Sequence, residues 1–365
     1  MHIGIFLAPY QRHSGAGEYY HHLIWELTVP NNGLHYTVFL PSDADRSAEE
    51  HLPGVTCVRT RVPSSPALLR HAATVLSRVA ARHRPALDLL HCVNTPMPLF
   101  GGPTVLTVYD LREEDLPETH GAFHNAFVKA TRPGALRRAN RVIAISRFTA
   151  ARLAVHYPAC VSKTRIIPLG CVASAGGDMT QPPHPRPYIL TVGHLRPHKN
   201  HQRLIRAFNA LASQDDFPFD LVVVGRNDLG EAFMREEAGG CHPLGRIVFT
   251  GEITEGEKAA WYRHASLFVF PSLYEGFGLP LLEAFAAGVP VAASDIPIFR
   301  ELYGLEKALF NPRDPEAIAR TINVMVLDND LRRRSLAAGA EITATYTWPR
   351  MAERTIRVYQ ELVNG

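Results

Sequence analysis

The sequence predicts an α/β protein with two domains, each built on buried parallel strands that alternate with helices. Short apolar runs, such as LFVFPS at residues 267–272, recur along the chain between longer helical segments. Such runs are typical of strands that are buried on both faces of a parallel sheet. A chain of 365 residues is long enough for two domains. Residues 174–187 (SAGGDMTQPPHPRP) combine Gly, Pro and polar residues without periodicity, which indicates a linker.

The composition is typical of a globular cytoplasmic protein. Hydrophobic residues make up 46% of the chain and charged residues 20%, an ordinary balance for such domains. No run of about 18 apolar residues is present that could cross a membrane, and the opening residues MHIGIFLAPY lack the features of a signal peptide. The five cysteines are scattered and form no C-x-x-C pair, so we expect reduced thiols rather than disulfides or zinc ligands.

The net charge of +3 is unevenly distributed, because the first 172 residues are basic and the remainder is acidic. A basic first half favours an acidic partner, such as a phosphorylated acceptor or an anionic membrane surface. The imbalance is too mild to indicate nucleic acid, and no nucleic-acid-binding motif accompanies it. A helix predicted at residues 67–83 carries Arg70, Arg78 and Arg82 opposite its apolar face. That basic face is either simply solvated or a surface for anionic lipid or a lipid-diphosphate acceptor.

In the first domain, a helix begins at Gly15, Ala16 and Gly17, after the strand at residues 3–8. These glycines follow the strand at a distance and Tyr20 holds the third glycine position, so the motif departs from a dinucleotide-binding fingerprint. Further strands are predicted at residues 36–41, 55–62, 87–93, 104–110 and 142–146, and at the start of TRIIPLGC, residues 164–171.

The strand at residues 104–110 ends with Tyr109 and Asp110. Open α/β sheets bind ligands at the carboxyl ends of their strands, so these two residues are candidates for contact with a ligand. The alternative is a purely structural role at a strand end. Ser146 is predicted to cap the next helix.

In the second domain, the strand at residues 188–193 leads into the loop HLRPHKN and then a helix at residues 202–213. Arg196 and Lys199 lie in this loop. The planar guanidinium of the arginine and the mobile ammonium of the lysine could bind a diphosphate. The alternative is an exposed basic loop. Two more strands follow at residues 221–225, ending at Gly225, and at residues 247–253.

The most informative stretch is LFVFPSLYEGFGLPLLEAFAAGVPVAAS, residues 267–294. It predicts a strand, a loop with Gly276 and Gly278, a helix, and another strand. Pro280 suits the first turn of that helix, and Gly288 suits the position just beyond its end.

Two carboxylates distinguish this stretch from ordinary packing. Glu283 is the single charged residue of an apolar helix, where a carboxylate is costly unless something donates hydrogen bonds to it. We interpret its counterpart as a ligand rather than a neighbouring side chain. Glu275 precedes the helix N-terminus, where N–H groups and the helix dipole favour an anion. A sugar joined to a diphosphate and a ribose fits this arrangement, and a solvated loop followed by a core helix is the alternative.

The motif EGFGLPLLEAFAAGVPV resembles the signature of glycosyltransferase family 4, the retaining, mannosyltransferase-like group 1 transferases of the GT-B fold. The resemblance continues in order through SGAGEYYHHLIWEL (14–27), VGHLRPHKN (192–200), LVVVG (221–225) and FTGEI (249–253). It implies two Rossmann-like, doubly wound parallel-sheet domains that face a central cleft. The acceptor-side domain would span residues 1–173 and the nucleotide-sugar domain residues 188–345. A C-terminal helix within residues 346–365 would pack back on the first domain.

The resemblance also implies roles for individual residues. Glu283 would bind the ribose hydroxyls, Glu275 would hold the transferred sugar, and Lys199 and Arg196 would bind the diphosphate. In the family an arginine commonly follows the glycine directly, whereas His194 has that place here. The remaining donor-binding positions are Gly276, Phe277, Gly278, Leu279, Gly225, Ile253, Gly15, Ala16 and Gly17. Tyr109 stands where many members have a histidine that contacts the donor sugar, and Asp110 follows it.

The resemblance implies a metal-independent, retaining hexosyltransferase without a cofactor, which acts in the synthesis of cell-surface polysaccharide or glycoconjugate. Its donor would be a GDP- or UDP-linked sugar and its acceptor a saccharide or lipid-linked glycan. We expect a cytoplasmic location, with peripheral contact to an anionic membrane. The sequence shows no Asp-x-Asp pair and no His/Cys cluster for a metal. In the family, retention of the anomeric configuration is usually explained by attack of the acceptor on the same face that the leaving group departs from. A mechanism with Glu275 as a carboxylate nucleophile is the alternative.

Two other functions stay open. One is a nucleotide-sugar epimerase of the same fold, and the other is a non-catalytic subunit that binds a sugar nucleotide. The acceptor side falls on residues 11–17, 63–66 and 113–125, which show no clear pattern.

Overall fold

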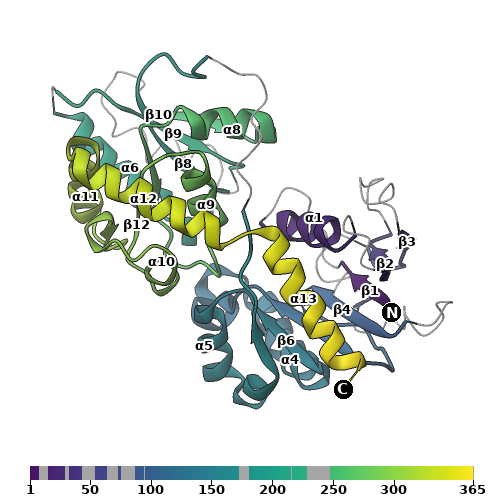
Figure 1. The fold of residues 1–365 in the computed structure, drawn as a ribbon. Helices are drawn as coiled ribbons and strands as arrows, with labels where there is room; N and C mark the ends of the chain where they lie inside the picture. Colours follow the sequence, from purple (N-terminus) through teal and green to yellow (C-terminus); the bar gives the residue numbers. More distant parts are fainter. Residues whose placement is uncertain are drawn as a thin grey trace. The chain divides into compact units, whose positions relative to one another are not determined.

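The computed structural model describes residues 1–7, 15–28, 33–42, 54–63, 73–74, 87–93, 95–171, 181–214, 216–227 and 247–364. The chain forms two compact units. One comprises Met1–Gly170 and Trp348–Gly365, and the other comprises Cys171–Thr347 (Figure 1). The basic helix predicted at residues 67–83 lies outside the described residues except for residues 73–74, and so does the first half, residues 174–180, of the linker predicted at residues 174–187.

The first unit is built on a seven-stranded sheet with the order β3-β2-β1-β4-β5-β6-β7. All of its strand pairs are parallel. The strands are β1 (His2–Phe6), β2 (His35–Leu40), β3 (Val55–Arg59), β4 (Leu89–Val93), β5 (Thr104–Val108), β6 (Arg141–Ala144) and β7 (Thr164–Ile166). Because the strand order reverses between β1 and β4, the carboxyl ends of these two strands flank the switch point where such sheets bind ligands.

The helices of the first unit are α1 (Gly15–Thr28), α3 (Arg112–Asp115), η3 (Pro117–Thr119), α4 (Ala122–Arg138), α5 (Arg147–His156), η4 (Pro158–Lys163) and α13 (Trp348–Val363). As predicted, Ser146 caps α5, and its hydroxyl accepts a hydrogen bond from the Thr149 N–H at 2.9 Å. The prediction that residues 113–125 lack regular structure is wrong, because α3, η3 and the start of α4 occupy them.

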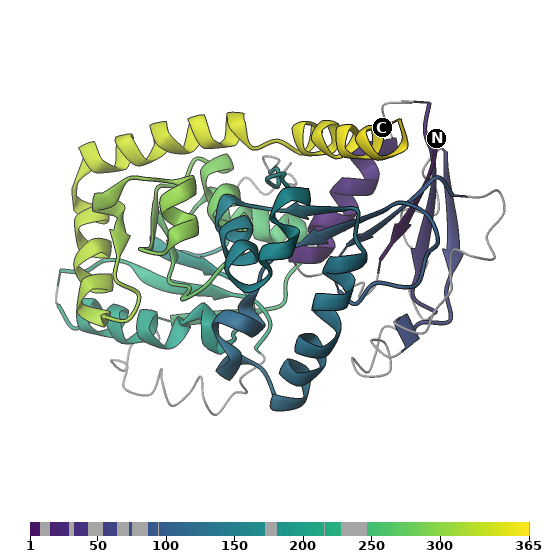
Figure 2. The same ribbon diagram turned by 90° about the horizontal axis from the view of Figure 1, so that it is seen from below.

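The C-terminal helix α13 belongs to the first unit and contacts α1 (Figure 2). The Trp348 ring stacks on His22 with centroids 4.4 Å apart. The Tyr359 hydroxyl lies 2.7 Å from Nδ1 of His91, whose Nε2 lies 2.8 Å from the Thr107 hydroxyl. Both His91 and Tyr359 are completely buried, so the last helix completes the core that β4 and β5 begin.

The second unit is built on a six-stranded sheet with the order β10-β9-β8-β11-β12-β13. Its strand pairs are also parallel. The strands are β8 (Tyr188–Val192), β9 (Asp220–Val224), β10 (Ile247–Gly251), β11 (Leu267–Phe270), β12 (Val291–Ser294) and β13 (Leu309–Phe310). Here the order reverses between β8 and β11, so the loops after these two neighbours meet at one edge of the sheet.

The helices of the second unit are η5 (Pro197–Lys199), α6 (His201–Ala212), α8 (Glu255–Arg263), α9 (Leu279–Ala286), α10 (Pro297–Leu302), η6 (Glu306–Ala308), α11 (Pro315–Leu327) and α12 (Asn329–Thr345). As predicted, α9 has Pro280 in its first turn and Gly288 just beyond its end, with a left-handed φ of 74°. None of the helices in the described ranges combines the length and the apolar character needed to cross a bilayer.

Candidate functional site

Two loops meet at the switch point of the second sheet, one after β8 and the other after β11. Asn200 joins them, because its buried amide donates hydrogen bonds to the carbonyl of Pro271 at 2.9 Å and to that of Pro312 at 2.7 Å. The Leu273 N–H donates to the His198 carbonyl at 2.8 Å. The two loops are therefore fixed to each other before any ligand is considered. Asn200 was not among the site residues predicted from the sequence, although an asparagine directly before a helix, here α6, was a usable signal.

Lys199 and Glu275 face each other across these loops. The Lys199 ammonium donates to a Glu275 carboxylate oxygen at 2.6 Å and lies 5.4 Å from the centre of the Phe270 ring. Their side chains are 17% and 13% exposed, so the pair is largely shielded yet open to solvent. The structure thus brings together two of the three residues predicted to be catalytic.

Arg196, the third predicted residue, lies at the start of η5, where its carbonyl accepts a hydrogen bond from the Lys199 N–H at 2.9 Å. Its backbone therefore shapes the turn that presents Lys199. His194 precedes it on the same loop.

Glu283 lies in the middle of α9, and its carboxylate has two protein partners. The Tyr262 hydroxyl donates to one oxygen at 2.8 Å and the Lys258 ammonium to the other at 3.2 Å. Both partners come from α8, and the Glu283 side chain is 22% exposed. The prediction that Glu283 has no neighbouring side chain as a partner is wrong, because α8 supplies two. A carboxylate has about four acceptor positions, so capacity for ribose hydroxyls remains.

Two of the predicted donor-binding glycines have structural reasons for their identity. Gly225 has φ +141°, and a Cβ there would lie 2.2 Å from the carbonyl oxygen of Gly193. Gly278 has φ +117°, and its Cβ would lie 2.8 Å from the Phe299 ring. Packing within the unit therefore already requires glycine at both positions, whether or not a ligand approaches them.

The other predicted donor-binding residues of this unit lie on the same segments. Gly276 and Phe277 are buried in the loop between β11 and α9, and the Phe277 ring packs edge-on against Tyr346. Leu279 is the first residue of α9. Ile253 lies between β10 and Thr254, the N-cap of α8.

In the first unit, Gly15, Ala16 and Gly17 begin α1 as predicted, and the segment before them, residues 8–14, lies outside the described residues. Tyr109 follows β5, and its ring packs edge-on against those of Tyr19 and Tyr20, with centroids 5.3 and 6.2 Å away. Its hydroxyl is enclosed, and burial raises the pKa of Tyr109 well above its ordinary value. Tyr109 therefore carries no positive charge, and its side chain is longer than that of the histidine that many family members have at this position.

Asp110 is turned towards its own loop, where its carboxylate accepts a hydrogen bond from the Arg112 N–H at 3.3 Å. Burial raises the pKa of Asp110, an effect that the charges of Arg112 and Arg132 partly offset. Thr149, on α5, donates from its hydroxyl to the Tyr109 carbonyl at 3.0 Å. The end of β5 is thus fixed from both sides.

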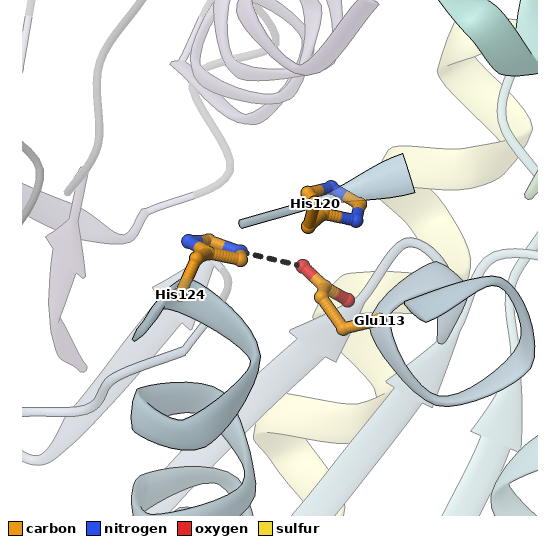
Figure 3. A group of neighbouring side chains, drawn as sticks. All are labelled: Glu113, His120 and His124. Carbon is orange, nitrogen blue, oxygen red and sulfur yellow. Dashed lines mark hydrogen bonds and ion pairs between the residues drawn. The ribbon is translucent and has the colours of Figure 1, made fainter. Parts of the chain in front are cut away.

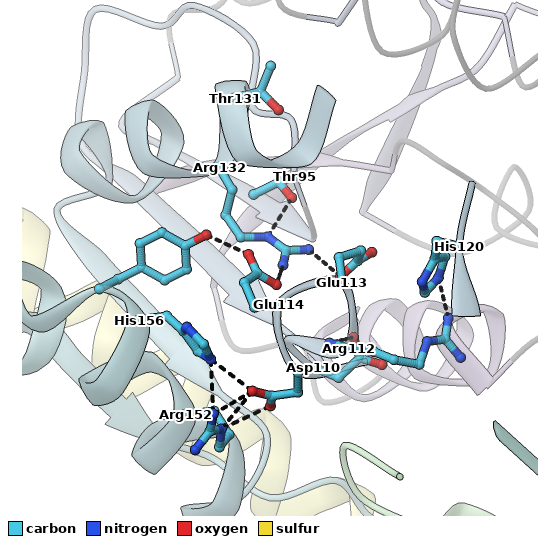
Figure 4. Close-up of polar contacts among 12 residues, drawn as sticks. Thr95, Asp110, Arg112, Glu113, Glu114, His120, Thr131, Arg132, Arg152 and His156 are labelled. Carbon is cyan, nitrogen blue, oxygen red and sulfur yellow. Dashed lines mark hydrogen bonds and ion pairs between the residues drawn. The ribbon is translucent and has the colours of Figure 1, made fainter. Parts of the chain in front are cut away.

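A network of charged side chains that sequence reasoning missed surrounds this strand end (Figure 4). Arg132, on α4, is 4% exposed and bonds Glu113 at 3.0 Å and Glu114 at 2.5 Å. Nearby, Asp115 bonds Arg152 at 2.5 Å and His156 at 2.8 Å. Burial of Arg132 lowers its pKa, but Glu113 and Glu114 outweigh that effect and hold the pKa above its ordinary value. The run Glu113–Glu114–Asp115 was the available signal in the sequence.

One group in the described residues could also hold a metal ion, namely Glu113, His120 and His124. No local pattern in the sequence indicated this group. Glu113 lies on α3, His120 follows η3 and His124 lies in the first turn of α4, so their proximity depends on how these three elements fold together.

Two family models match consecutive parts of the chain. The model "Glycosyltransferase Family 4" matches residues 13–175, and the model "Glycosyl transferases group 1" matches residues 179–341. The chain belongs to the group 1 glycosyltransferases. The parallel sheets of its two units are those of the GT-B fold, as the sequence predicted.

Relatives of this glycosyltransferase include characterised bacterial proteins. It is 26% identical to the O-antigen chain mannosyltransferase B of Escherichia coli over 71% of this chain and 70% of that protein. It is 32% identical to the serotype-specific mannosyltransferase WbdA of Escherichia coli over 50% of this chain and 22% of that protein. The chain thus spans less than a quarter of the length of WbdA.

Among solved structures, the HepE protein of Anabaena in complex with UDP and glucose is similar to this glycosyltransferase, with a TM-score of 0.74 and 19% identity. The match covers 99% of this chain and 100% of that one. At this identity the likeness establishes the shared fold.

Proposed function

We propose that this chain is a retaining hexosyltransferase that moves a sugar from a nucleotide-diphosphate donor to a saccharide or lipid-linked acceptor. The observation that carries the proposal is the Lys199–Glu275 pair at 2.6 Å, held at the switch point of the second sheet. Neither side chain is deeply enclosed, and both lie on loops that Asn200 fixes in place. A preorganised cation and carboxylate at this edge suit a diphosphate and a sugar.

In this proposal Lys199 exchanges part of its contact with Glu275 for the donor diphosphate. The bond between the anomeric carbon and the phosphate oxygen breaks, and the acceptor oxygen forms the new bond on the same face. The acceptor proton passes to the leaving phosphate. Lys199, with Arg196 beside it, stabilises the charge that develops on the leaving group, and Glu275 holds the sugar hydroxyls.

Glu283 would bind the ribose of the donor. Because Tyr262 and Lys258 already orient its carboxylate, the remaining acceptor positions are presented in a fixed geometry. Gly276, Phe277, Gly278 and Leu279 would line the sugar and phosphate, with Gly225 and Ile253 at the nucleotide. Gly15, Ala16, Gly17, Tyr109 and Asp110 would contribute from the first unit.

The donor is proposed to be a GDP- or UDP-linked hexose, with mannose the first sugar to test because two relatives are named mannosyltransferases. A role in cell-surface glycan synthesis follows from the O-antigen relative. Cytoplasmic location, with peripheral contact to an anionic membrane, and transfer without a metal or a cofactor belong to the same proposal.

The test begins with thermal stabilisation by a panel of GDP-, UDP- and dTDP-linked sugars, because a ligand of the folded state raises its melting temperature. Transfer of the stabilising sugar to glycan acceptors is then measured for K199A and E275A. Each should reduce the transfer rate by about 10²–10³-fold, the cost of losing one preorganised charge-stabilising group.

Lys307→Ala and Glu306→Ala provide matched controls, since both residues are exposed on the same unit. Unchanged transfer in K199A and E275A would show that the site assignment is wrong. Donor isomerised without acceptor consumption would indicate an epimerase instead. Donor binding without release of nucleoside diphosphate would indicate a non-catalytic subunit.

A further inference from the structure

Three side chains with metal-ligating atoms converge after β5 in the first unit (Figure 3). Glu113 lies on α3, His120 follows η3, and His124 lies in the first turn of α4. One ligand atom from each lies within 4.8 Å of the other two. From this arrangement we infer that Glu113, His120 and His124 form a binding site for a transition-metal ion of the Zn²⁺ type. The inference goes beyond the proposed sugar transfer and does not depend on it.

The Nε2 lone pair of His120 already faces a positively charged group, the guanidinium of Arg112. A guanidinium nitrogen of Arg112 lies 3.1 Å from Nε2 of His120. Because arginine can only donate, Nε2 accepts and the ring proton lies on Nδ1. Nδ1 lies 3.1 Å from the Thr119 hydroxyl, which donates its own hydrogen to the Leu116 carbonyl at 2.7 Å. A second partner that fixes the tautomer in this way is what metal-ligating histidines usually have.

The Glu113 carboxylate is oriented in a similar manner. One oxygen accepts from the buried Arg132 at 3.0 Å, and the other lies 3.3 Å from Nε2 of His124. The oxygen that faces His124 is therefore a candidate ligand atom, and the other oxygen of the same carboxylate is held by Arg132, as in other metal sites.

The cluster is compact and open to solvent. The rings of His120 and His124 are stacked with centroids 5.0 Å apart and an interplanar angle of 17°. The His124 side chain is 34% exposed and that of Glu113 is 13% exposed, so an ion has access. Tetrahedral Zn²⁺ with bonds of about 2.0–2.1 Å places its ligand atoms roughly 3.4 Å apart. Nε2 of His124 and the facing Glu113 oxygen, 3.3 Å apart, already have that spacing, and one ligand atom of His120 lies within 4.8 Å of each.

The ligand set selects the class of ion. Two imidazoles and one carboxylate favour Zn²⁺ and neighbouring transition metals, whereas Mg²⁺ prefers oxygen ligands alone. Three protein ligands leave the fourth tetrahedral position to water or an anion. Arg112 would compete with the ion for His120, because its guanidinium donates to the Nε2 lone pair that would coordinate the ion.

The first experiment titrates ZnCl₂ into the chelator-treated full-length chain and measures binding by calorimetry. Wild type should bind one ion at this site. Glu113→Gln, His120→Gln and His124→Gln should each weaken that binding by more than about 100-fold, the upper end of what changes around a ligand cost. His35→Gln is the matched control, because His35 is an exposed histidine on β2 and should leave affinity unchanged.

Arg112→Ala distinguishes a metal site from a merely structural cluster. Removing the competing guanidinium should tighten Zn²⁺ binding, whereas loss of a structural contact would weaken it or leave it unaltered. Arg137→Ala is the matched control, because Arg137 is exposed on α4. Far-UV circular dichroism and melting temperatures in chelator establish that each variant is folded.

Anomalous scattering at the zinc edge from soaked crystals locates the ion independently. A peak between Glu113, His120 and His124 supports the inference. A peak elsewhere, equal affinity in wild type and the glutamine variants, or no binding at all overturns it. All of these measurements report binding, so failure of the sugar-transfer proposal leaves them unaffected.

Discussion

Asn200 determines how two loops of the second unit are joined. It is 3% exposed, has a left-handed φ of 59°, and donates to the carbonyls of Pro271 and Pro312. Asparagine is one of the few residues that adopt this backbone conformation readily. A single side chain therefore positions the turn that carries Lys199.

We predict that Asn200→Ala destabilises the second unit by about 2–4 kcal/mol, because two buried carbonyls lose their donor and alanine is strained at this φ. Asn200→Gly should be less costly than alanine by about 1 kcal/mol, since glycine relieves the strain but restores no hydrogen bond. Urea unfolding measures both. Equal stability of wild type and the alanine variant would mean that the two loops are held by other contacts.

At the same scale, the sequence indicated where in the fold Lys199 and Glu275 lie, but not which side chains surround Glu283. The positions of Lys199 and Glu275 at strand ends followed from the apolar runs before them. The partners of Glu283 did not, because Tyr262 and Lys258 lie on α8, about 20 residues earlier in the chain. Nothing local in the sequence shows which face of α8 packs on α9.

At the scale of elements, two helical glycines of the second unit differ in their surroundings. A Cβ on Gly339 of α12 would lie 2.3 Å from the Phe285 ring of α9, whereas a Cβ on Gly256 of α8 would meet nothing within 4 Å. Gly339 therefore allows α12 to approach α9 closely, and Gly256 has no such role.

We expect Gly339→Ala to destabilise the second unit by about 1–3 kcal/mol through overpacking, despite the better helix propensity of alanine. Gly256→Ala should stabilise it by about 0.5 kcal/mol. Chemical denaturation of the two variants side by side checks both signs. Stabilisation by Gly339→Ala would show that Phe285 moves aside at little cost.

The C-terminal helix was predictable from the sequence, and the short helices α3 and η3 were not. α13, Trp348–Val363, lies within residues 346–365, where the sequence predicted a C-terminal helix. α3 and η3 span four and three residues, too few to show a helical period. They form because the acidic run at Glu113 meets Arg132 on α4, which no local pattern reveals.

For the whole molecule, each unit contains a buried histidine that titrates far below its ordinary range. Burial lowers the pKa of His91 in the first unit to about 3. Burial, together with the charge of Lys199, lowers the pKa of His201 in the second unit to about 3. Neither group binds a proton in the folded protein at pH 5, whereas both do so in the unfolded chain, where the pKa is about 6.5.

The contribution of these two histidines to the free energy of unfolding should therefore be fully present above about pH 6.5 and should be lost as the pH decreases towards 3. Each histidine contributes about 1.4 kcal/mol per pH unit over that window. Urea unfolding at pH 7.5 and 5.0 measures the loss. His91→Gln and His201→Gln should each show a shallower dependence on pH, and an unaltered dependence in both would contradict the assignment.

The division into two units has a consequence for synthesis. Trp348 and Tyr359 complete the core of the first unit, yet the ribosome adds them only after residues 171–347 have been synthesised. At roughly 5–20 residues per second this interval lasts on the order of ten seconds or more. During that time the nascent first unit lacks α13 and exposes the apolar surface that this helix later covers. A chaperone that shields this surface during translation would raise the yield of native protein.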